Sequence, residues 1–328
     1  MHVSFSRVKT WRRCHAAHDY KYNQGLQRKR RSIPLLRGTI LGEMLDARAM
    51  AQSGSRLKPM DVLEKYRKKY RVLFKEEQEK YGDIIGDIKR IYEGYERKYA
   101  DDPWTYLKTE HLLTIDLTKD IRFIGYADKV VQDREGRMWI VDHKAYRSIP
   151  SDEDRFSDLQ SVFYIWAYGI QHPKDPIMGF CWDYLRTKPP TIPEPLARGG
   201  LSVAKNLDTD YDTYMEAIKK HNLDPADYKE TLERLKRETA TRFYRRVYLP
   251  SPPKVLIDNA VADMRSTAIE IKNLGDTLRD RNMSRDCKQC EYFNLCQAEY
   301  RGLDADFIRK TEYEEKPPHE EEMVNETE

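Results

Sequence analysis

The sequence has no long apolar run. None of its segments reaches the roughly 18 consecutive apolar residues that a membrane-spanning helix needs. The segment 1–13 is basic, but it lacks the apolar stretch of a secretory signal peptide. These two absences exclude a membrane span, and we expect a cytoplasmic protein that does not act at a membrane.

A loop for nucleotide phosphates is also absent. The chain contains no G-x-x-x-x-G-K-[ST] segment, whose backbone amides cradle the phosphates in ATP-driven motors. The chain is therefore not itself an ATP-driven helicase of that class. Its 328 residues, 39% of them hydrophobic, are enough to bury the core of one large domain or two modest ones.

The small net charge of +3 hides a strong asymmetry along the chain. Residues 312–328 contain eight Glu and one Lys, which leaves a charge of +10 on the remainder. The first forty residues hold ten Lys or Arg, densest at 28–31, and one acidic residue, Asp19. Such a basic cluster is often only a solvated face, but it can also contact a phosphate backbone.

The hydrophobic pattern changes along the chain. Residues 59–99 place apolar and tyrosine side chains at helical spacing, and short β-like segments begin near residue 106. The turn at 133–136, with Gly136 supplying a positive φ, predicts a hairpin. We expect strands at 107–117, 121–132, 137–146 and 178–186, and helices at 154–169, 211–219, 225–242 and 253–273.

These patterns divide the chain into four parts. We expect an N-terminal helical region at 1–105, an α/β core at 106–190 and a C-terminal helical region at 191–300. The last part, 301–328, is interpreted as an acidic tail, and we expect it to be disordered because few of its residues can be buried.

Charged side chains surround the predicted hairpin. In a strand over 137–146, Asp142 and Lys144 project to one face and His143 to the other. The hairpin brings Asp128 beside them. Two carboxylates can hold Mg²⁺ or Mn²⁺, which polarises a phosphate and activates water. A D-x-K pair is commonly a solvated ion pair. Here, however, the apolar run 138–141 is typical of a buried strand, where charged side chains are costly unless they have partners or a function.

These motifs resemble the PD-(D/E)xK nuclease superfamily, specifically its RecB-like branch. Gly125-Tyr126-Ala127-Asp128 matches the G-x-x-D of that branch, and Asp142 with Lys144 matches its D-x-K. Downstream, Gln160 and Tyr164 match a Q-x-x-x-Y helix motif and lie on one helical face. The resemblance implies a restriction-endonuclease-like α/β fold, with a central mixed sheet flanked by helices.

The resemblance also implies roles for individual residues. It makes Asp128, Asp142 and Lys144 catalytic, and it places Gln160 and Tyr164 in support of the active site or the DNA. A further acid is expected on the preceding strand, where Glu110 is the best match and Asp116 a weaker one. The candidate metal ligands are then Glu110, Asp128 and Asp142, to which we add the neighbouring His143.

The sequence departs from the branch at one position. The branch often has a His ligand in an N-terminal helix, within a stretch similar to R-G-x-x-x-H-E. Here the stretch Arg37-Gly38-Thr39-Ile40-Leu41-Gly42-Glu43 has Gly42 where that His would stand. Either Glu43 or a water molecule takes the place of the His as a metal ligand, or the activity is reduced.

The cysteines form a separate constellation. Cys287, Cys290 and Cys296 give C-x2-C-x5-C among polar residues, and Cys14 stands near the opposite end. An odd count of five without an export signal argues against disulfides, and four thiolates fit either zinc or an iron-sulfur cluster. Cys181, in an apolar strand, is interpreted as an ordinary buried thiol.

The arrangement of three cysteines plus one resembles the iron-sulfur clasp of CRISPR-adaptation exonucleases and AddB-type nuclease domains. The resemblance therefore implies a 4Fe-4S cluster rather than zinc, joining the N- and C-terminal helical regions. Such a staple would remove much chain entropy from the unfolded state.

We therefore expect a metal-dependent DNA exonuclease that hydrolyses phosphodiester bonds at single-stranded or duplex ends. Recombination, repair or replication are the expected processes, with a separate helicase or recombination protein as a possible partner. One alternative is a catalytically weak or inactive DNA-binding or assembly protein of the same fold, suggested by Gly42. Another is a CRISPR spacer-processing nuclease with dedicated partners.

Overall fold

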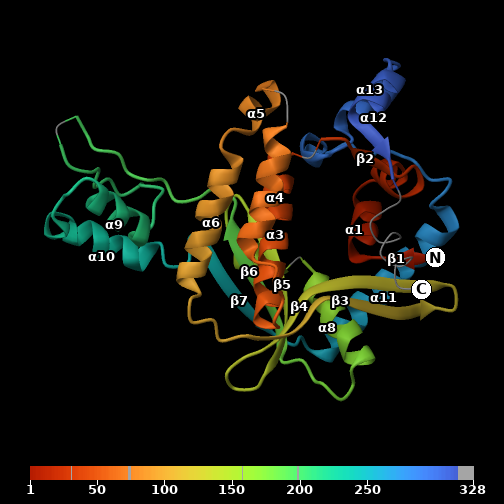
Figure 1. Ribbon diagram of the computed structural model, residues 1–328. Helices are drawn as coiled ribbons and strands as arrows, with labels where there is room; N and C mark the ends of the chain where they lie inside the picture. Colours follow the sequence, from red (N-terminus) through yellow and green to blue (C-terminus); the bar gives the residue numbers. More distant parts are fainter. Residues whose placement is uncertain (31, 73–74, 157, 198, 317–328) are drawn as a thin grey trace.

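A six-stranded mixed sheet with helices on both faces forms the centre of the molecule (Figure 1). The structure is a computed structural model that describes residues 1–30, 32–72, 75–156, 158–197 and 199–316. The architecture confirms the predicted fold class, a central mixed sheet flanked by helices.

The sheet is built around a long hairpin. β3 pairs with β4 along one edge of β4, while β1 and β5 pair with the beginning and the end of its other edge. β5 and β6 are parallel, and β7 runs antiparallel to β6 at the far side. The predicted turn between β4 and β5 has Gly136 at φ 79°. The strands are β1 (His2–Val3), β3 (Thr105–Thr118), β4 (Ile121–Gln132), β5 (Met138–Tyr146), β6 (Gly179–Arg186) and β7 (Tyr244–Pro250).

A helical crossover joins the two parallel strands, as a parallel pair requires. It consists of α7 (Asp152–Phe156) and α8 (Gln160–Gln171), where the sequence predicted a single helix. The chain begins α8 anew because the Asp158 carboxylate accepts a hydrogen bond from the Gln160 backbone N–H at 3.1 Å. The crossover thus starts α8 with Gln160 close to the end of β5.

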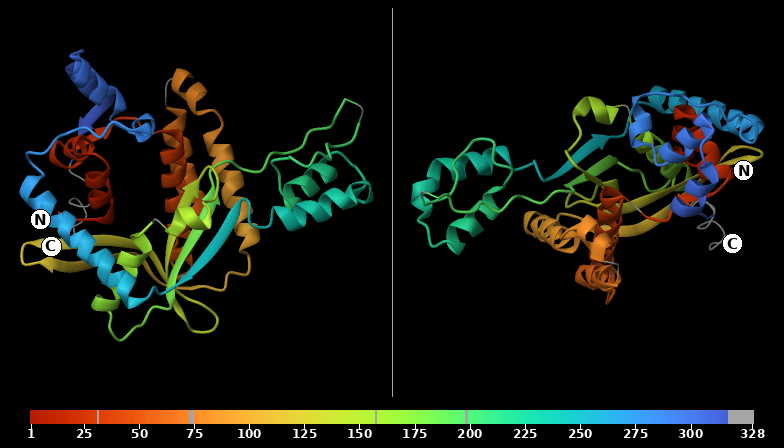
Figure 2. Two further views of the ribbon diagram at one scale, coloured as in Figure 1. Left: turned by 180° about the vertical axis from the view of Figure 1, so that it is seen from behind. Right: turned by 90° about the horizontal axis from the view of Figure 1, so that it is seen from above.

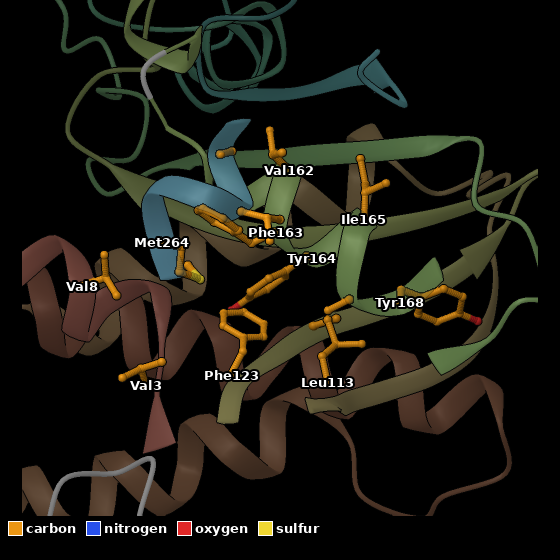
Figure 3. Packing of buried hydrophobic residues seen from close by; sticks show 14 of the residues in the cluster. Val3, Val8, Leu113, Phe123, Val162, Phe163, Tyr164, Ile165, Tyr168 and Met264 are labelled. Carbon is orange, nitrogen blue, oxygen red and sulfur yellow. The ribbon is translucent and has the colours of Figure 1, made fainter. Parts of the chain in front are cut away.

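The first face of the sheet is covered by α8, α1 (Phe5–Arg13) and α11 (Lys254–Leu274). Aromatic and aliphatic side chains of these helices meet apolar side chains of the strands in one buried cluster (Figure 3). The labelled members include Val8 of α1, Leu113 and Phe123 of the sheet, Phe163 and Tyr164 of α8, and Met264 of α11. This packing fixes α8 across the strands that carry the candidate site.

The second face is covered by α3 (Ile33–Gln52), α4 (Pro59–Arg71) and α6 (Ile84–Lys98), which run side by side in Figure 1. Short α5 (Lys75–Tyr81) joins α4 to α6. The buried stripe of α6, including Ile88 and Tyr95, packs against Leu185 and Tyr244 of the sheet. The helical periodicity of 59–99 therefore reflects core packing. No described helix has the length and apolar character of a membrane span.

Segments from near the two ends of the described chain meet in a separate lobe, called here the cysteine lobe (residues 14–28 and 285–315). In it β2 pairs antiparallel with β8 (Figure 1). Residues 305–315 form a helix and a strand, with Tyr313 3% exposed, so the predicted disorder of the 301–328 tail is wrong for this part. Residues 317–328 lie outside the described residues. The elements are α2 (His15–His18), π-helical η1 (Asp19–Asn23), β2 (Leu26–Arg28), 3-10 helix η3 (Arg285–Gln289), α12 (Phe293–Arg301), α13 (Ala305–Glu312) and β8 (Tyr313–Glu315).

A small helical unit projects away from the sheet (Figure 2). It comprises α9 (Tyr211–Lys220), the 3-10 helix η2 (Pro225–Tyr228) and α10 (Lys229–Glu238), and it has its own small core. The helix predicted at 225–242 ends at Glu238, and the chain then returns to the sheet as β7. The sheet therefore extends beyond the predicted core boundaries of 106–190.

Candidate functional site

The end of β5 carries a buried ion pair. Asp142 is 1% exposed, and its Oδ2 lies 2.7 Å from Lys144 Nζ. Its Oδ1 accepts a hydrogen bond of 3.0 Å from Nε2 of Gln160 in the first turn of α8. The structure thus brings together three of the residues that the sequence selected, on the sheet face that α8 covers.

β4 and β5 separate beside this ion pair. Their pairing ends with Lys129 opposite Val141, while β5 stays paired with β6 as far as Tyr146. Asp128 occupies the gap, because its Oδ2 accepts a 2.7 Å hydrogen bond from the backbone N–H of His143. The Asp128 carboxylate is therefore held against the β5 backbone, between the positions of Asp142 and Lys144.

Glu110 adds a third carboxylate from β3. The strand register places it opposite Asp128, and its φ of 49° is sparsely populated for a residue other than glycine. Burial and the carboxylates of Asp46 and Asp128 raise the pKa of Glu110 to about 7. Asp116, the weaker sequence candidate, is 69% exposed and pairs with Arg122 instead.

The charges at the site keep the Lys144 side chain protonated beside the carboxylates of Asp142 and Asp128. Burial raises the pKa of Asp142, and the Lys144 ammonium opposes that shift. Burial alone would lower the pKa of Lys144, but the carboxylates of Asp142 and Asp128 hold it above its usual range. Lys144 is therefore an ammonium at neutral pH, able to stabilise negative charge but not to accept a proton.

Tyr164 supports the site through packing. It follows Gln160 by one helical turn and is 7% exposed. A Cβ built on Gly125 would lie 2.8 Å from Cε1 of the Tyr164 ring, so glycine lets α8 approach β4. Burial raises the pKa of the Tyr164 hydroxyl above its usual range. The glycine of G-x-x-D and the tyrosine of Q-x-x-x-Y are thus partners in one contact.

His143 requires a correction. Its side chain projects to the opposite face of the sheet, where Nδ1 lies 3.1 Å from Oδ2 of Asp183 on β6. Asp183 also accepts a 2.5 Å hydrogen bond from the Tyr95 hydroxyl and lies 3.6 Å from Nε of Arg246. Because strand side chains alternate, the imidazole cannot reach the carboxylates, and His143 leaves the candidate ligand set. Only its backbone N–H contributes to the site.

Two residues that the sequence analysis did not select also reach the site. Lys129 is fully buried, and its Nζ pairs with Asp46 of α3 and donates a 2.9 Å hydrogen bond to the carbonyl oxygen of Asp128. A lysine in an apolar strand is a signal in itself, because lysine is seldom buried without a partner. Its partner, however, lies 83 residues earlier in the chain, beyond the reach of a local pattern.

The donor set fits a hard divalent cation. Carboxylate oxygens such as those of Glu110, Asp128 and Asp142 are the ligands that Mg²⁺ and Mn²⁺ prefer. A cation would relieve the repulsion that, together with burial, raises the pKa of Glu110. Within the described residues, no three His, Cys, Asp or Glu side chains are placed to hold a metal ion as they stand. Cation binding therefore has to exchange some present contacts, such as that between Asp142 and Lys144.

Four of the five cysteines line one cavity of the cysteine lobe. Cys14 lies between α1 and α2, Cys287 in η3, Cys290 directly after η3 and Cys296 in α12. The backbone N–H of Ser284 points at the sulfur of Cys287 at 3.5 Å, and burial raises the pKa of Cys290. The four thiols share this cavity, although within the described residues no three of them are placed to hold a metal ion as they stand. Cys181 is fully buried in β6, away from this cavity.

A basic groove lies between the cysteine lobe and the α3–α6 layer. It consists of three cavities that share lining residues, chiefly Arg28, Lys29 and Arg30. Arg31, the last residue of the predicted basic run, lies outside the described residues. The groove is also lined by Lys21, Lys288 and Lys316 of the lobe side and by Tyr66, Lys69, Tyr70 and Tyr81 of the helical layer.

Sequence comparison agrees with this geometry. No curated protein matches the chain. The model of one family, the PD-(D/E)XK nuclease superfamily, matches residues 2–297. The matched range includes the sheet, the carboxylates beside Lys144 and all four cysteines of the cavity. With a match over nearly its whole length, the chain belongs to the PD-(D/E)XK nuclease superfamily.

Proposed function

We propose that this protein is a metal-dependent deoxyribonuclease of the RecB-like branch that hydrolyses phosphodiester bonds at DNA ends. One observation carries the proposal. Where β4 and β5 separate, Asp128, Asp142 and Lys144 converge with Gln160, in the order and on the elements that the motifs predict. Because the chain belongs to the nuclease superfamily, we interpret this group of side chains as the site of phosphodiester hydrolysis.

Each residue has a distinct part in the proposed reaction. Glu110, Asp128 and Asp142 would hold Mg²⁺ or Mn²⁺, and such a cation polarises a phosphodiester and lowers the pKa of bound water. The Lys144 ammonium, 2.7 Å from Asp142, stabilises negative charge that develops on the phosphate. The Gln160 amide keeps the Asp142 carboxylate oriented through its 3.0 Å hydrogen bond.

The basic groove supports DNA as the substrate. Lysine and arginine side chains neutralise backbone phosphates, and tyrosine rings offer surfaces on which bases stack. The groove combines both, because Arg28, Lys29, Tyr70 and Tyr81 are all among its lining residues. A single strand, whose bases are accessible, suits this combination better than a closed duplex. We therefore place the incoming strand in this groove.

We also propose that Cys14, Cys287, Cys290 and Cys296 hold a 4Fe-4S cluster. Their common cavity and the polar sequence around the C-x2-C-x5-C segment support a ligand role over packing. Bound there, the cluster would tie the first helices of the chain to α12 and hold the cysteine lobe together. A single zinc ion is the competing occupant, and iron analysis distinguishes the two.

The nuclease proposal is tested with end-labelled linear DNA and covalently closed circular DNA of the same sequence. Protein purified without oxygen is incubated with Mg²⁺, Mn²⁺ or EDTA. We expect metal-dependent release of nucleotides from linear DNA, none from circles, and loss of release in Asp142→Asn. Asp116→Asn is the matched control, because Asp116 is exposed and pairs with Arg122.

Two results would contradict the proposal in different ways. Cleavage of circles at the rate of linear DNA would show an endonuclease. Binding of DNA without release of nucleotides under any metal would show a DNA-binding protein of the same fold.

A further inference from the structure

Helix α3 packs on the second face of the sheet, opposite α8, and three of its residues are spaced one turn apart. Gly38, Gly42 and Asp46 lie at i, i+4 and i+8 and therefore share one face of the helix. Gly38 faces β5, where a Cβ built on it would lie 3.8 Å from Cβ of Ala145. Asp46 meets Lys129 of β4. Gly42 thus stands between these two contacts, over the second face of β4 and β5.

The position of Gly42 is open. A Cβ built there would meet no atom within 4 Å. Glu43, the substitute suggested by the sequence, does not turn toward it: one carboxylate oxygen accepts a hydrogen bond from the Tyr66 hydroxyl, and the other lies 3.3 Å from Nζ of Lys65. Glu43 is therefore engaged with α4 and is unavailable to the site.

Asp46 is the acidic side chain that α3 directs at β4, where β4 and β5 separate. It pairs with Lys129, whose fully buried side chain also donates to the backbone carbonyl of Asp128. Lys129 Nζ thus links the Asp46 carboxylate to the backbone of Asp128, and the charge of Asp46 adds to burial in raising the pKa of Glu110. The ion pair with the buried ammonium group of Lys129 holds the Asp46 carboxylate in a fixed position beside β4.

We propose that Asp46 is a carboxylate of the catalytic cation site, supplied by α3 one turn beyond the open position of Gly42. This inference rests on the proposed function. Lys129 is the counter-ion that holds Asp46 toward Asp128 before a cation enters. A divalent cation adds to, or replaces, the lysine as the partner of the Asp46 carboxylate, which then joins Glu110, Asp128 and Asp142.

The test measures Mn²⁺ binding to metal-free protein without DNA, by calorimetry and by the EPR signal of free Mn²⁺. We expect Asp46→Asn to weaken binding about 10- to 100-fold, the range for residues that support or complete a metal site. Glu43→Gln, one turn away on the same helix, is the matched control and retains the affinity of the wild type. Thermal unfolding of each variant checks that it is folded.

A double variant separates a cation ligand from a mere partner of Lys129. If Asp46 only neutralises the buried lysine, Asp46→Asn/Lys129→Met removes both charges and restores Mn²⁺ affinity, which would overturn the proposal. We expect no restoration, because the lost carboxylate is the one that contacts the cation. Wild-type affinity in Asp46→Asn alone would overturn it as well.

The same titration keeps this inference distinct from the nuclease proposal. Mn²⁺ binding that depends on Asp142 and Asp46, in a protein that releases no nucleotides, would leave Asp46 in the cation site and refute the nuclease. Hydrolysis by the wild type, with full Mn²⁺ affinity in Asp46→Asn, would refute only Asp46. A wild type that binds no Mn²⁺ would refute both.

Discussion

Two neighbouring carboxylates stabilise the positive charge of Lys144. It pairs with the buried Asp142, and the Asp128 carboxylate also helps to hold its pKa high. We expect Lys144→Met to lower the single-turnover rate of DNA hydrolysis by about 100- to 1,000-fold, the usual cost of removing a group that stabilises transition-state charge. Mn²⁺ should still bind, because the carboxylates remain.

The comparison uses single-turnover hydrolysis beside a Mn²⁺ titration of the same preparation. Lys174→Met changes an exposed loop lysine and is the control for loss of one positive charge. A wild-type rate in Lys144→Met would remove this lysine from the reaction.

Glu110 makes cation binding depend on pH. Its pKa is raised to about 7 by burial and by the carboxylates of Asp46 and Asp128. Below that pH the side chain is protonated and cannot bind a cation, whereas above it the ionised form is available. Mn²⁺ affinity should therefore rise as pH increases from about 6 to 8, with release of a proton on binding.

The experiment is calorimetry in buffers of different ionisation enthalpy, which counts the protons released. Glu110→Gln should bind more weakly and lose the part of the pH dependence that Glu110 contributes, while Asp142, whose pKa burial also raises, keeps the rest. If the variant shows the same pH profile as the wild type, another group titrates.

At the scale of elements, the site depends on the contacts that β5 makes on both faces of the sheet. On one face Asp142 pairs with Lys144 and accepts a hydrogen bond from Gln160 of α8, and on the other His143 meets Asp183 of β6. Alternation along one strand therefore couples a reactive face to a structural one. Asp183, fully buried, links β5 and β6 to Tyr95 of α6 and Arg246 of β7.

Asp183→Ala tests this anchoring. Removing one partner from a buried ionic network leaves the charge of Arg246 without its full compensation, and such changes cost about 3–5 kcal/mol of unfolding free energy. Urea unfolding measures the loss, with exposed Asp116→Asn expected to change stability by less than about 0.5 kcal/mol. An equally small change for Asp183→Ala would show that the network does not anchor β5.

At the scale of the whole molecule, the cysteine lobe joins distant parts of the chain. Its cavity gathers Cys14 with three cysteines near residue 290, and β2 pairs with β8 beside it. We expect protein purified without oxygen to contain about four iron atoms per chain. Cys290→Ser should lose iron and the brown absorbance and unfold at lower temperature, because the staple is gone.

Cys181→Ala is the matched control, since Cys181 is buried in β6 and does not line the cavity. It should keep its iron. Zinc in place of iron in the wild type, or full iron content in Cys290→Ser, would contradict the cluster assignment.

Prediction of helices and strands from the sequence succeeded where a segment shows one clear hydrophobic pattern. β3 to β6 followed from short apolar segments and the hairpin turn, and α6 from its buried stripe. β7 was missed because its charged sequence, which includes Arg245 and Arg246, becomes a strand only through pairing with β6. The tail 305–315 was missed because its acidic composition conceals Tyr313, which is buried against the cysteine lobe.

The sequence by itself determined the family, the mixed α/β class and the spacing of Asp128, Asp142, Lys144 and Gln160, because these depend on local order and period. Tertiary structure alone decided which side chains meet across the chain. It turned His143 away to Asp183, and it brought Asp46 of α3 to Lys129. The physical reason is that such contacts depend on how helices cross the sheet, which is set by the packing of whole faces and not by neighbouring residues.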